Sequence, residues 1–188
     1  MRDYSTLLWT RRTFLKTSLV GGLILSGCMT WPARTRAAQL PEGRLTWYNL
    51  HTDERLAVTY RNDAGHYDHG ALDEINFVLR CHYTNEVAAM DVRLIEYVNL
   101  VQKKLGDGKE IHVVSGYRSP EYQALLVRTS RRAARHSYHV QGQAIDLQIP
   151  GVHPWAVRQA AFKLKCGGVG YYPRSKFVHL DSGPFRTW

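Results

Sequence analysis

Two short segments in the second half of the chain alternate apolar and polar residues, and this alternation constrains the fold more than any other feature. In residues 144–149, isoleucine and leucine occupy every second position, and Asp146 lies between them. In residues 177–181, valine and leucine alternate with His179 and Asp181. Successive side chains of a strand point to opposite faces, so each segment is expected to be a strand with its apolar face on a core. Asp146, His179 and Asp181 then lie on the opposite face.

The remaining pattern predicts a mixed fold. Residues 45–50 and 56–60, separated by a polar stretch, predict a β-hairpin, and residues 111–115 predict a further short strand. Apolar stripes and end signals predict helices over residues 72–79, 92–105, 120–126 and 154–165, the second of them closed by Gly106. In the first helix, Asp73 and Glu74 are expected in the first turn, where they would complement the helix dipole. We therefore expect a single α+β domain with a small, mostly antiparallel sheet flanked by helices.

The N-terminal segment is expected to be an export signal and not part of the fold. Arg11 and Arg12 precede a short apolar run, which resembles a twin-arginine signal and is too short to span a bilayer. The residues that end at Cys28 resemble a lipobox, which implies a lipid anchor on that cysteine; cleavage after Ala38 is the alternative. The export-signal hypothesis predicts a periplasmic protein with a signal over residues 1–28, a linker over residues 29–44 and a folded domain over residues 45–188.

Composition restricts the class of partner. The chain has 188 residues, enough for one domain, and a formal net charge of +9, which favours an anionic partner. The basic residues are scattered and no nucleic-acid-binding motif is recognisable, so we expect no nucleic acid partner. Cys81 and Cys166 are too few for a disulfide framework. A disulfide between them is one alternative in an oxidising periplasm, and the expectation is that both are buried free thiols. Nothing in the sequence predicts an oligomer, so a monomer is the default.

His139, Asp146 and His179 are the candidate ligands of a metal ion. Two imidazoles and a carboxylate suit Zn²⁺ and leave its fourth position open for water, as in hydrolytic sites. Residue type and spacing alone leave a second interpretation open, in which His139 is a surface histidine and Asp146 is merely solvated. The metal hypothesis predicts one Zn²⁺ per chain, in a cleft on the polar face of the sheet.

Residues 137–146 follow the pattern Ser-x-His-x-x-Gly-x-Ala-x-Asp. Together with His179 on a later strand, this pattern resembles the signature of the M15 family of zinc D-Ala-D-Ala peptidases. Residues 115–119, Ser-Gly-Tyr-Arg-Ser, resemble the family segment that carries a substrate-facing arginine, here Arg118. Over residues 45–188, the chain is most similar to the exported murein endopeptidase K branch of that family.

The resemblance implies a hydrolase of peptidoglycan. In this branch, the bonds cleaved are amide bonds of peptide cross-links between two meso-diaminopimelate residues. The resemblance assigns the zinc ligands to His139, Asp146 and His179, and it implies that Arg118 polarises the scissile carbonyl or holds a substrate carboxylate. The alternative for Arg118 is an ordinary ion pair with an acid such as Glu121.

One position departs from the wider family. Carboxypeptidases of the family place a general-base glutamate three residues before the last histidine, where this chain has Lys176. Asp181 is the candidate for the base, because strand alternation sets it beside His179; alternatively, Asp181 orients a ligand or caps the turn that follows. Two further functions therefore stay open: a D,D- or L,D-carboxypeptidase acting on stem peptides, and a cell-wall binding protein without catalysis.

Overall fold

The hairpin expected at the start of the domain forms one edge of a larger sheet. The computed structural model describes residues 41–130, 134 and 136–188, and these residues belong to one compact unit. Within them, β1 (Gly43–Asn49) and β2 (Arg55–Arg61) pair in antiparallel fashion, which confirms the hairpin. β1 begins inside the range that was expected to be a linker.

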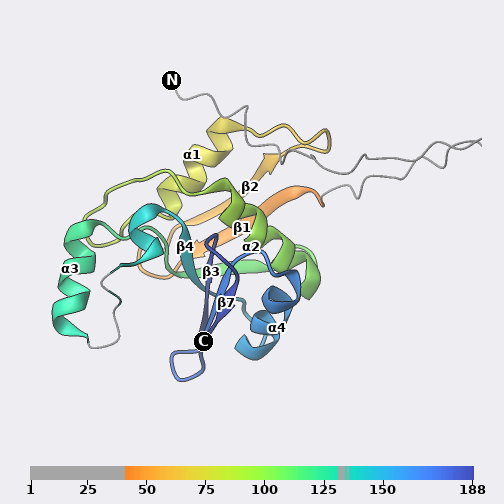
Figure 1. The fold of residues 1–188 in the computed structure, drawn as a ribbon. Helices are drawn as coiled ribbons and strands as arrows, with labels where there is room; N and C mark the ends of the chain where they lie inside the picture. The colour runs from red at the N-terminus through yellow and green to blue at the C-terminus, as the bar shows by residue number, and fades with distance from the viewer. Residues whose placement is uncertain (1–40, 131–133, 135) are drawn as a thin grey trace, which may run out of the picture. The chain divides into compact units, whose positions relative to one another are not determined.

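The sheet has seven strands in the order β2-β1-β3-β4-β6-β5-β7 (Figure 1). The β1–β3 and β5–β7 pairs are parallel, and the other four neighbouring pairs are antiparallel. An α+β domain with a mostly antiparallel sheet is thereby confirmed. The other strands are β3 (Glu110–Ser115), β4 (Ala144–Gln148), β5 (Gly168–Tyr172), β6 (Phe177–Asp181) and β7 (Arg186–Thr187).

Sequence reasoning does not predict β5 or β7. β5 is rich in glycine, so it shows little alternation, and its first residue was expected only to stop the preceding helix. The glycines meet a packing requirement. A Cβ on Gly168 would lie 2.3 Å from Oδ2 of Asp181, and a Cβ on Gly170 would lie 2.7 Å from the ring of Trp188. Because both distances are overlaps, β5 must lack side chains at these points to let the C-terminal residues pack beside it.

The helices lie close to their predicted positions. α1 begins earlier than expected, because the side chain of Asp68 accepts a hydrogen bond from the backbone N of Ala71 and caps the helix. The expectation that Asp73 and Glu74 occupy the first turn is therefore wrong. The helices are α1 (His69–Val78), α2 (Val92–Leu105), α3 (Pro120–Thr129) and α4 (Pro154–Leu164), with a short 3₁₀ helix, η1 (Tyr138–Gln141).

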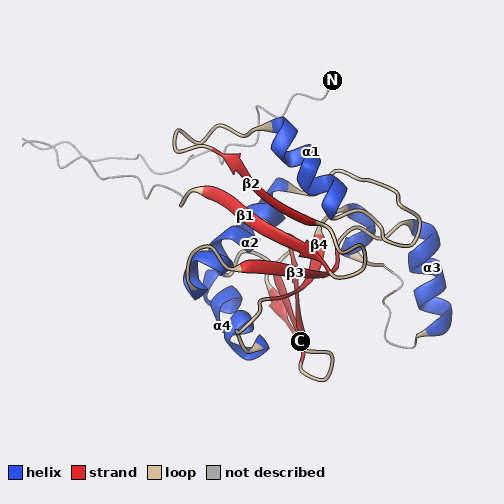
Figure 2. Cartoon of the chain, turned by 180° about the vertical axis from the view of Figure 1, so that it is seen from behind, coloured by secondary structure: helices blue, strands red, loops and turns tan. Residues whose placement is uncertain are grey.

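The apolar side of the sheet faces α2 and α4. These two helices pack against each other and against the strands, α1 packs on β2, and α3 stands to one side (Figures 1 and 2). The apolar residues that alternate in β4, such as Ile145 and Leu147, are buried in the resulting core, as are Val178 and Leu180 of β6. Each side chain of this size contributes about 1.5–3 kcal/mol of hydrophobic free energy, so the core fixes which face of these strands points away from the helices.

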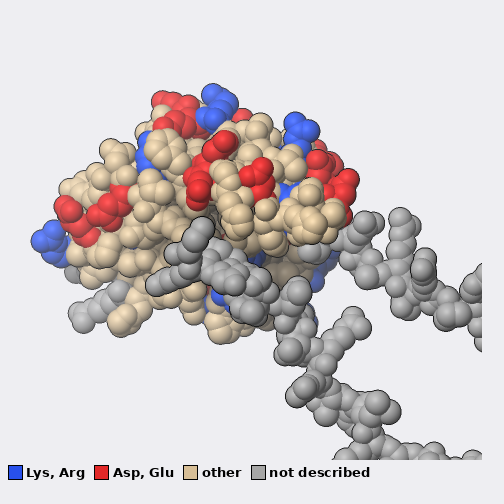
Figure 3. Space-filling view, turned by 90° about the horizontal axis from the view of Figure 1, so that it is seen from above, with Lys and Arg blue, Asp and Glu red and all other residues tan. Residues whose placement is uncertain are grey.

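The predicted signal and lipobox, including Cys28, lie outside the described residues. No helix in the described part of the chain has the length and apolarity needed to cross a membrane. Cys81 and Cys166 are both free; Cys81 is buried as expected, but Cys166 is exposed, because it follows the end of α4. Acidic and basic side chains are interspersed on the face seen from above (Figure 3), so this face is not a continuous basic surface.

Candidate metal centre

The register of β4 and β6 brings two candidate ligands together. Asp146 pairs directly with His179 across these antiparallel strands, and Ser115 of β3 pairs with Asp146 on the other side. Directly opposed residues on adjacent strands point to the same face, with Cβ atoms about 4.5–5.5 Å apart. Two residues that are distant in sequence thus become neighbours on the face turned away from the helices.

His139 reaches the same point from η1. The hydroxyl of Ser137 accepts a hydrogen bond from the backbone N of His139 and so stabilises the start of η1. Gly142 ends η1 in the left-handed conformation, with φ of 67°. A Cβ on Gly142 would lie 2.4 Å from the carbonyl O of Ala89. The glycine of the signature is therefore needed both for its backbone conformation and for its close approach to a neighbouring loop.

The three side chains converge on one point. Nε2 of His139 lies 3.2 Å from Nδ1 of His179, which lies 2.8 Å from Oδ1 of Asp146. The remaining pair, Nε2 of His139 and Oδ1 of Asp146, is 3.4 Å apart. His139, Asp146 and His179 expose only 2%, 4% and 9% of their surface. The interpretation of His139 as a surface histidine is therefore wrong, and Asp146 is buried beside it rather than solvated.

Hydrogen bonds on the far side of each ring determine which nitrogen faces this point. Nδ1 of His139 lies 2.7 Å from the carbonyl O of Gly116, which can only accept, so Nδ1 carries the proton and Nε2 is bare in the neutral ring. Nε2 of His179 lies 3.1 Å from Oδ2 of Asp181, which accepts the Nε2 proton, so in the neutral ring Nδ1 of His179 offers its lone pair towards the same point. Two nitrogen lone pairs and a carboxylate oxygen then face one another. Such a group of acceptors fits a cation between them.

The pKa values follow the same geometry. Burial is the largest effect on His139 and lowers its pKa, which favours the neutral, ligating form. Burial also acts to lower the pKa of His179, but the hydrogen bonds with Asp146 and Asp181 outweigh it and raise that pKa. Burial acts to raise the pKa of Asp146, and the two imidazoles more than reverse it, so the carboxylate is ionised. In the metal-free protein, a proton on His179 can therefore stand where a metal cation would bind.

Asp181 lies behind His179 and not on the side that faces the other ligands. Its carboxylate is fully buried and accepts two hydrogen bonds from Arg186, at 2.9 and 2.7 Å, and one from the backbone N of Gly183. Burial acts to raise its pKa, but His179 and Arg186 hold the pKa at about 2. Arg186 comes from β7, so this ionised carboxylate links the C-terminal strand to the candidate ligand.

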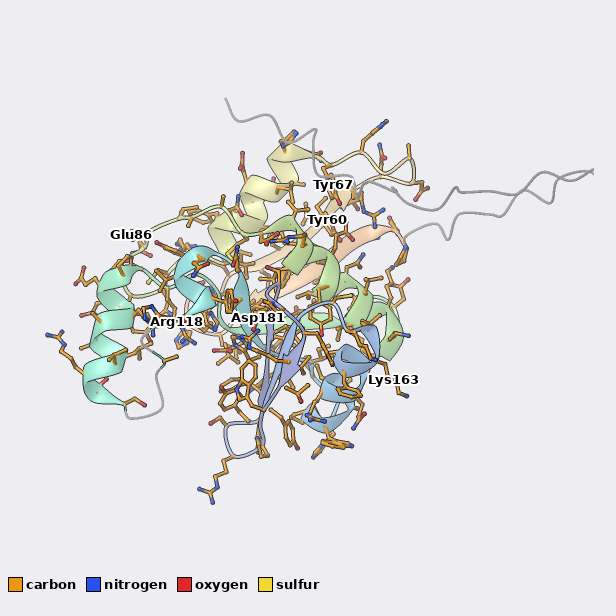
Figure 4. All side chains as sticks on the ribbon, viewed as in Figure 1. Tyr60, Tyr67, Glu86, Arg118, Lys163 and Asp181 are labelled. Carbon is orange, nitrogen blue, oxygen red and sulfur yellow. The ribbon has the colours of Figure 1, made fainter. Side chains whose placement is uncertain are left out.

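Arg118 joins the site through Asp146. Its Nε donates to the hydroxyl of Ser115 at 2.8 Å, and its Nη2 donates to Oδ2 of Asp146 at 2.5 Å. Arg118 and Asp181 both lie near the centre of the molecule, beside β4 (Figure 4). The ion pair with Glu121, which was the alternative for Arg118, is not formed; Arg118 is paired with Asp146 instead.

A cleft of about 220 Å³ opens beside Arg118 and Asp146. Sequence reasoning treats His51 and His82 as ordinary histidines, but both line this cleft. One signal could have found His51. It follows β1, which is parallel to β3, and the carboxyl ends of parallel neighbours lie at the same edge, where Arg118 also follows β3. The complete lining is His51, His82, Val114, Ser115, Arg118, Tyr122, Leu126, Asp146 and Phe177.

Comparison with known proteins shows the family of the chain. The family model described as peptidoglycan L,D-endopeptidase MepK, an M15 peptidase family, matches residues 37–188. The chain belongs to this family. The match confirms the predicted family and branch, and it identifies the chain as a hydrolytic peptidase.

Relatives of similar length support the assignment. Peptidoglycan L,D-endopeptidase MepK of Escherichia coli K12 is 36% identical over 174 residues, which cover 92% of this chain and 95% of the relative. A protein of Haemophilus influenzae, named probable peptidoglycan L,D-endopeptidase MepK, is 41% identical over 145 residues, 77% of each chain. M15 peptidases are generally metal-dependent, and within the described residues His139, Asp146 and His179 form a group that could hold a metal ion.

Proposed function

We propose that this chain is a zinc-dependent peptidoglycan endopeptidase that hydrolyses peptide cross-links, with bonds between two meso-diaminopimelate residues as its substrate. The observation that carries the proposal is the convergence of Nε2 of His139, Oδ1 of Asp146 and Nδ1 of His179, with both rings held in the ligating tautomer from behind. The MepK relatives, whose names specify peptidoglycan L,D-endopeptidase activity, support the substrate.

Three protein ligands leave an open position on a zinc ion, and a zinc ion lowers the pKa of a bound water to about 7 and so supplies a nucleophile at neutral pH. The protein's own part is to hold the ligands in place. The carbonyl of Gly116 fixes the ring of His139, and Asp181 fixes the ring of His179. Because the three ligands are almost fully buried, bulk water competes little with them for the metal.

Arg118 is suited to bind the reacting carbonyl. Two of its nitrogens are used by Ser115 and Asp146, whereas Nη1 has no hydrogen-bond partner within the described residues. The guanidinium is always charged, and its orientation is fixed by the two existing bonds. A donor fixed in advance stabilises the oxyanion that develops as the amide is attacked, which is the type of contribution that costs about 10²–10³ in kcat when removed.

The general base has two candidate interpretations. If Asp181 were the base, it would have to reach the attacking water, yet its carboxylate lies behind His179 and is bonded to Arg186. The contacts favour the second role, in which Asp181 orients His179 and caps the turn at Gly183. Lys176 does not substitute for the missing glutamate, because it is exposed in the turn between β5 and β6. This difference supports an endopeptidase over the carboxypeptidase alternative.

The test is digestion of sacculi that contain defined cross-links. Zinc-loaded protein is expected to convert dimeric muropeptides into monomers, and a chelator or the substitution His139→Ala should abolish this conversion. Shortening of monomeric stems without loss of dimers would identify a carboxypeptidase. Binding to sacculi without any cleavage would identify a cell-wall binding protein and refute the proposal.

Export to the periplasm is part of the same proposal, because the substrate lies there. It rests on Arg11, Arg12 and the apolar run that follows them. The mass of the mature N-terminus decides its form: an acylated Cys28 identifies a lipid-anchored protein, and a start at Gln39 identifies a protein cleaved without an anchor. A mature chain that still begins at Met1 would refute export.

A further inference from the structure

The cleft beside the metal centre contains more hydrogen-bond donors than its own residues use. Nη1 of Arg118 carries two N–H groups, of which the reacting carbonyl takes one, and neither the ring of His82 nor the hydroxyl of Tyr122 has a hydrogen-bond partner within the described residues. Asp146 is the only acid in the lining, and its two oxygens already face Arg118 and the imidazoles of the metal centre. The donors are therefore available to a ligand that accepts hydrogen bonds.

His82 is held in a defined position although its ring makes no hydrogen bond to the part of the chain that the structure describes. Its ring stacks on His51, with centroids 3.8 Å apart and an angle of 9° between the planes, and meets Tyr122 edge-on at 4.9 Å. Nε2 of His51 donates to the carbonyl O of Val114 at 3.0 Å, which holds the ring of His51 against β3. His51 thus acts as a positioning residue for His82.

The charge state of His82 is compatible with donation. Burial, followed by the nearby charges of His51 and Arg118, lowers its pKa, so the ring is mainly neutral at neutral pH. A neutral imidazole keeps one N–H, and here that N–H is free. The charge of Arg118 is paired with Asp146, so the preference for an anion rests on the free N–H groups, which bond more strongly to a charged acceptor than to a neutral one.

The other lining residues restrict the rest of the ligand. Leu126, Phe177 and Val114 give the cleft an apolar part, which suits methylene groups. The polar and apolar parts together match a short aliphatic chain that ends in a carboxylate. In the cross-link proposed above, the side chain of the acceptor meso-diaminopimelate has this chemistry, because its terminal amine is acylated and the carboxylate is the charged group left at that end.

We infer that the cleft formed by His82, Tyr122 and Arg118, with His51 behind it, is a specificity subsite for the free carboxylate at the end of a meso-diaminopimelate side chain. The inference deepens the proposed function and rests on it for the identity of the substrate. It assigns recognition of the substrate carboxylate to residues that are not metal ligands. This recognition can therefore be measured as binding of a probe that has no cross-link to cleave.

Equilibrium binding of two probes to the zinc-loaded protein tests this subsite. One probe is the stem tripeptide that ends in meso-diaminopimelate, with its side-chain amine acetylated as it is acylated in a cross-link, and the other is the same peptide with the carboxylate at the end of that side chain amidated. Wild-type protein is expected to bind the acid about tenfold more tightly, the effect of one charge-assisted hydrogen bond. The substitution His82→Phe keeps a flat ring for stacking but removes the N–H, and should reduce the preference to about threefold or less.

The matched control is His112→Phe. His112 lies on β3, pairs with Glu110 and does not line the cleft, so this variant should keep the wild-type preference and the zinc content. Equal binding of the two probes by wild-type protein, or binding of neither, overturns the subsite whether or not the variants fold. An unchanged preference in His82→Phe overturns the role of His82. The proposed function fails by a different result, intact cross-links after incubation with zinc-loaded wild-type protein.

Discussion

Asp181→Asn separates the two interpretations of the residue next to His179. The carboxylate of Asp181 is fully buried and lies 3.1 Å from Nε2 of His179. It accepts hydrogen bonds from Nη1 and Nη2 of Arg186. Asparagine has nearly the same shape, but it replaces one acceptor with a donor and removes the charge. Oδ1 receives the backbone N of Gly183 and of Gly168 as well as Nη1 of Arg186, so the amide oxygen is expected there. The NH₂ group then faces Nε2 of His179, whose ring loses its acceptor, and Arg186 keeps one of its two bonds.

Two magnitudes follow from this geometry. Loss of a partner that orients a metal ligand typically lowers metal affinity by 10–100-fold, which corresponds to about 1.4–2.7 kcal/mol. The ionised carboxylate also stabilises the fold, because its pKa is about 2 instead of 3.8, a difference worth about 2 kcal/mol. Since the pKa is lowered by folding, this stabilisation is complete above the unfolded value and is lost as the pH falls towards 2. At neutral pH, Asp181→Asn should lose most of it.

The assay combines zinc titration with cleavage measured at saturating zinc. If Asp181 orients His179, the variant should bind zinc more weakly but recover most of its turnover once zinc is saturating. Asp107→Asn is the matched control, because Asp107 forms an exposed ion pair with Lys103 and such pairs contribute little. Abolished turnover in a fully zinc-loaded Asp181→Asn protein would refute the positioning role and identify Asp181 as the base.

Three further predictions test other parts of the site. Because the pKa of His179 is raised in the metal-free protein, zinc must displace a proton from His179 at any pH below that pKa. In zinc titrations, the affinity for zinc should therefore decrease as the pH is lowered, by at most about tenfold per pH unit. An affinity that does not change with pH would contradict this. Arg118→Lys keeps the charge but loses the oriented donor, so kcat should fall about 10²–10³-fold at an unchanged zinc stoichiometry, and a kcat within a few fold of wild type would remove Arg118 from catalysis. Gly142→Ala should lower the free energy of unfolding by about 1–3 kcal/mol in urea titrations. The loss should exceed that of Gly151→Ala, because both glycines have positive φ but only Gly142 has an atom close to the added Cβ. Equal losses would show that the clash does not matter.

The polar face of β4 and β6 could be predicted because alternation is a local property. Once the apolar residues of both strands are assigned to the core, Asp146 and His179 must share the opposite face. The register that sets them directly opposite each other is not local, since it depends on the whole β4–β6 pairing. It was the resemblance to a known signature, and not the spacing, that joined His139 to this pair.

Other features depend on contacts that leave no periodic trace. The glycines of β5 leave room for the carboxylate of Asp181 and the ring of Trp188. The sequence of β5 by itself indicates neither contact. His51 lies in the loop after β1, and His82 lies in the loop after α1. Their rings stack because these two loops meet at one edge of the sheet, and no spacing in the sequence indicates this contact. The exposed position of Cys166 likewise depends on where α4 ends.

The central claim is that His139, Asp146 and His179 hold one zinc ion through Nε2, Oδ1 and Nδ1. Anomalous diffraction at the zinc edge, from crystals of zinc-loaded protein, tests it most directly. The account predicts a single anomalous peak within about 2.0–2.2 Å of all three atoms, and no such peak in His139→Ala crystals. A peak bound elsewhere, such as at the exposed thiol of Cys166, or no peak near these three residues would contradict it.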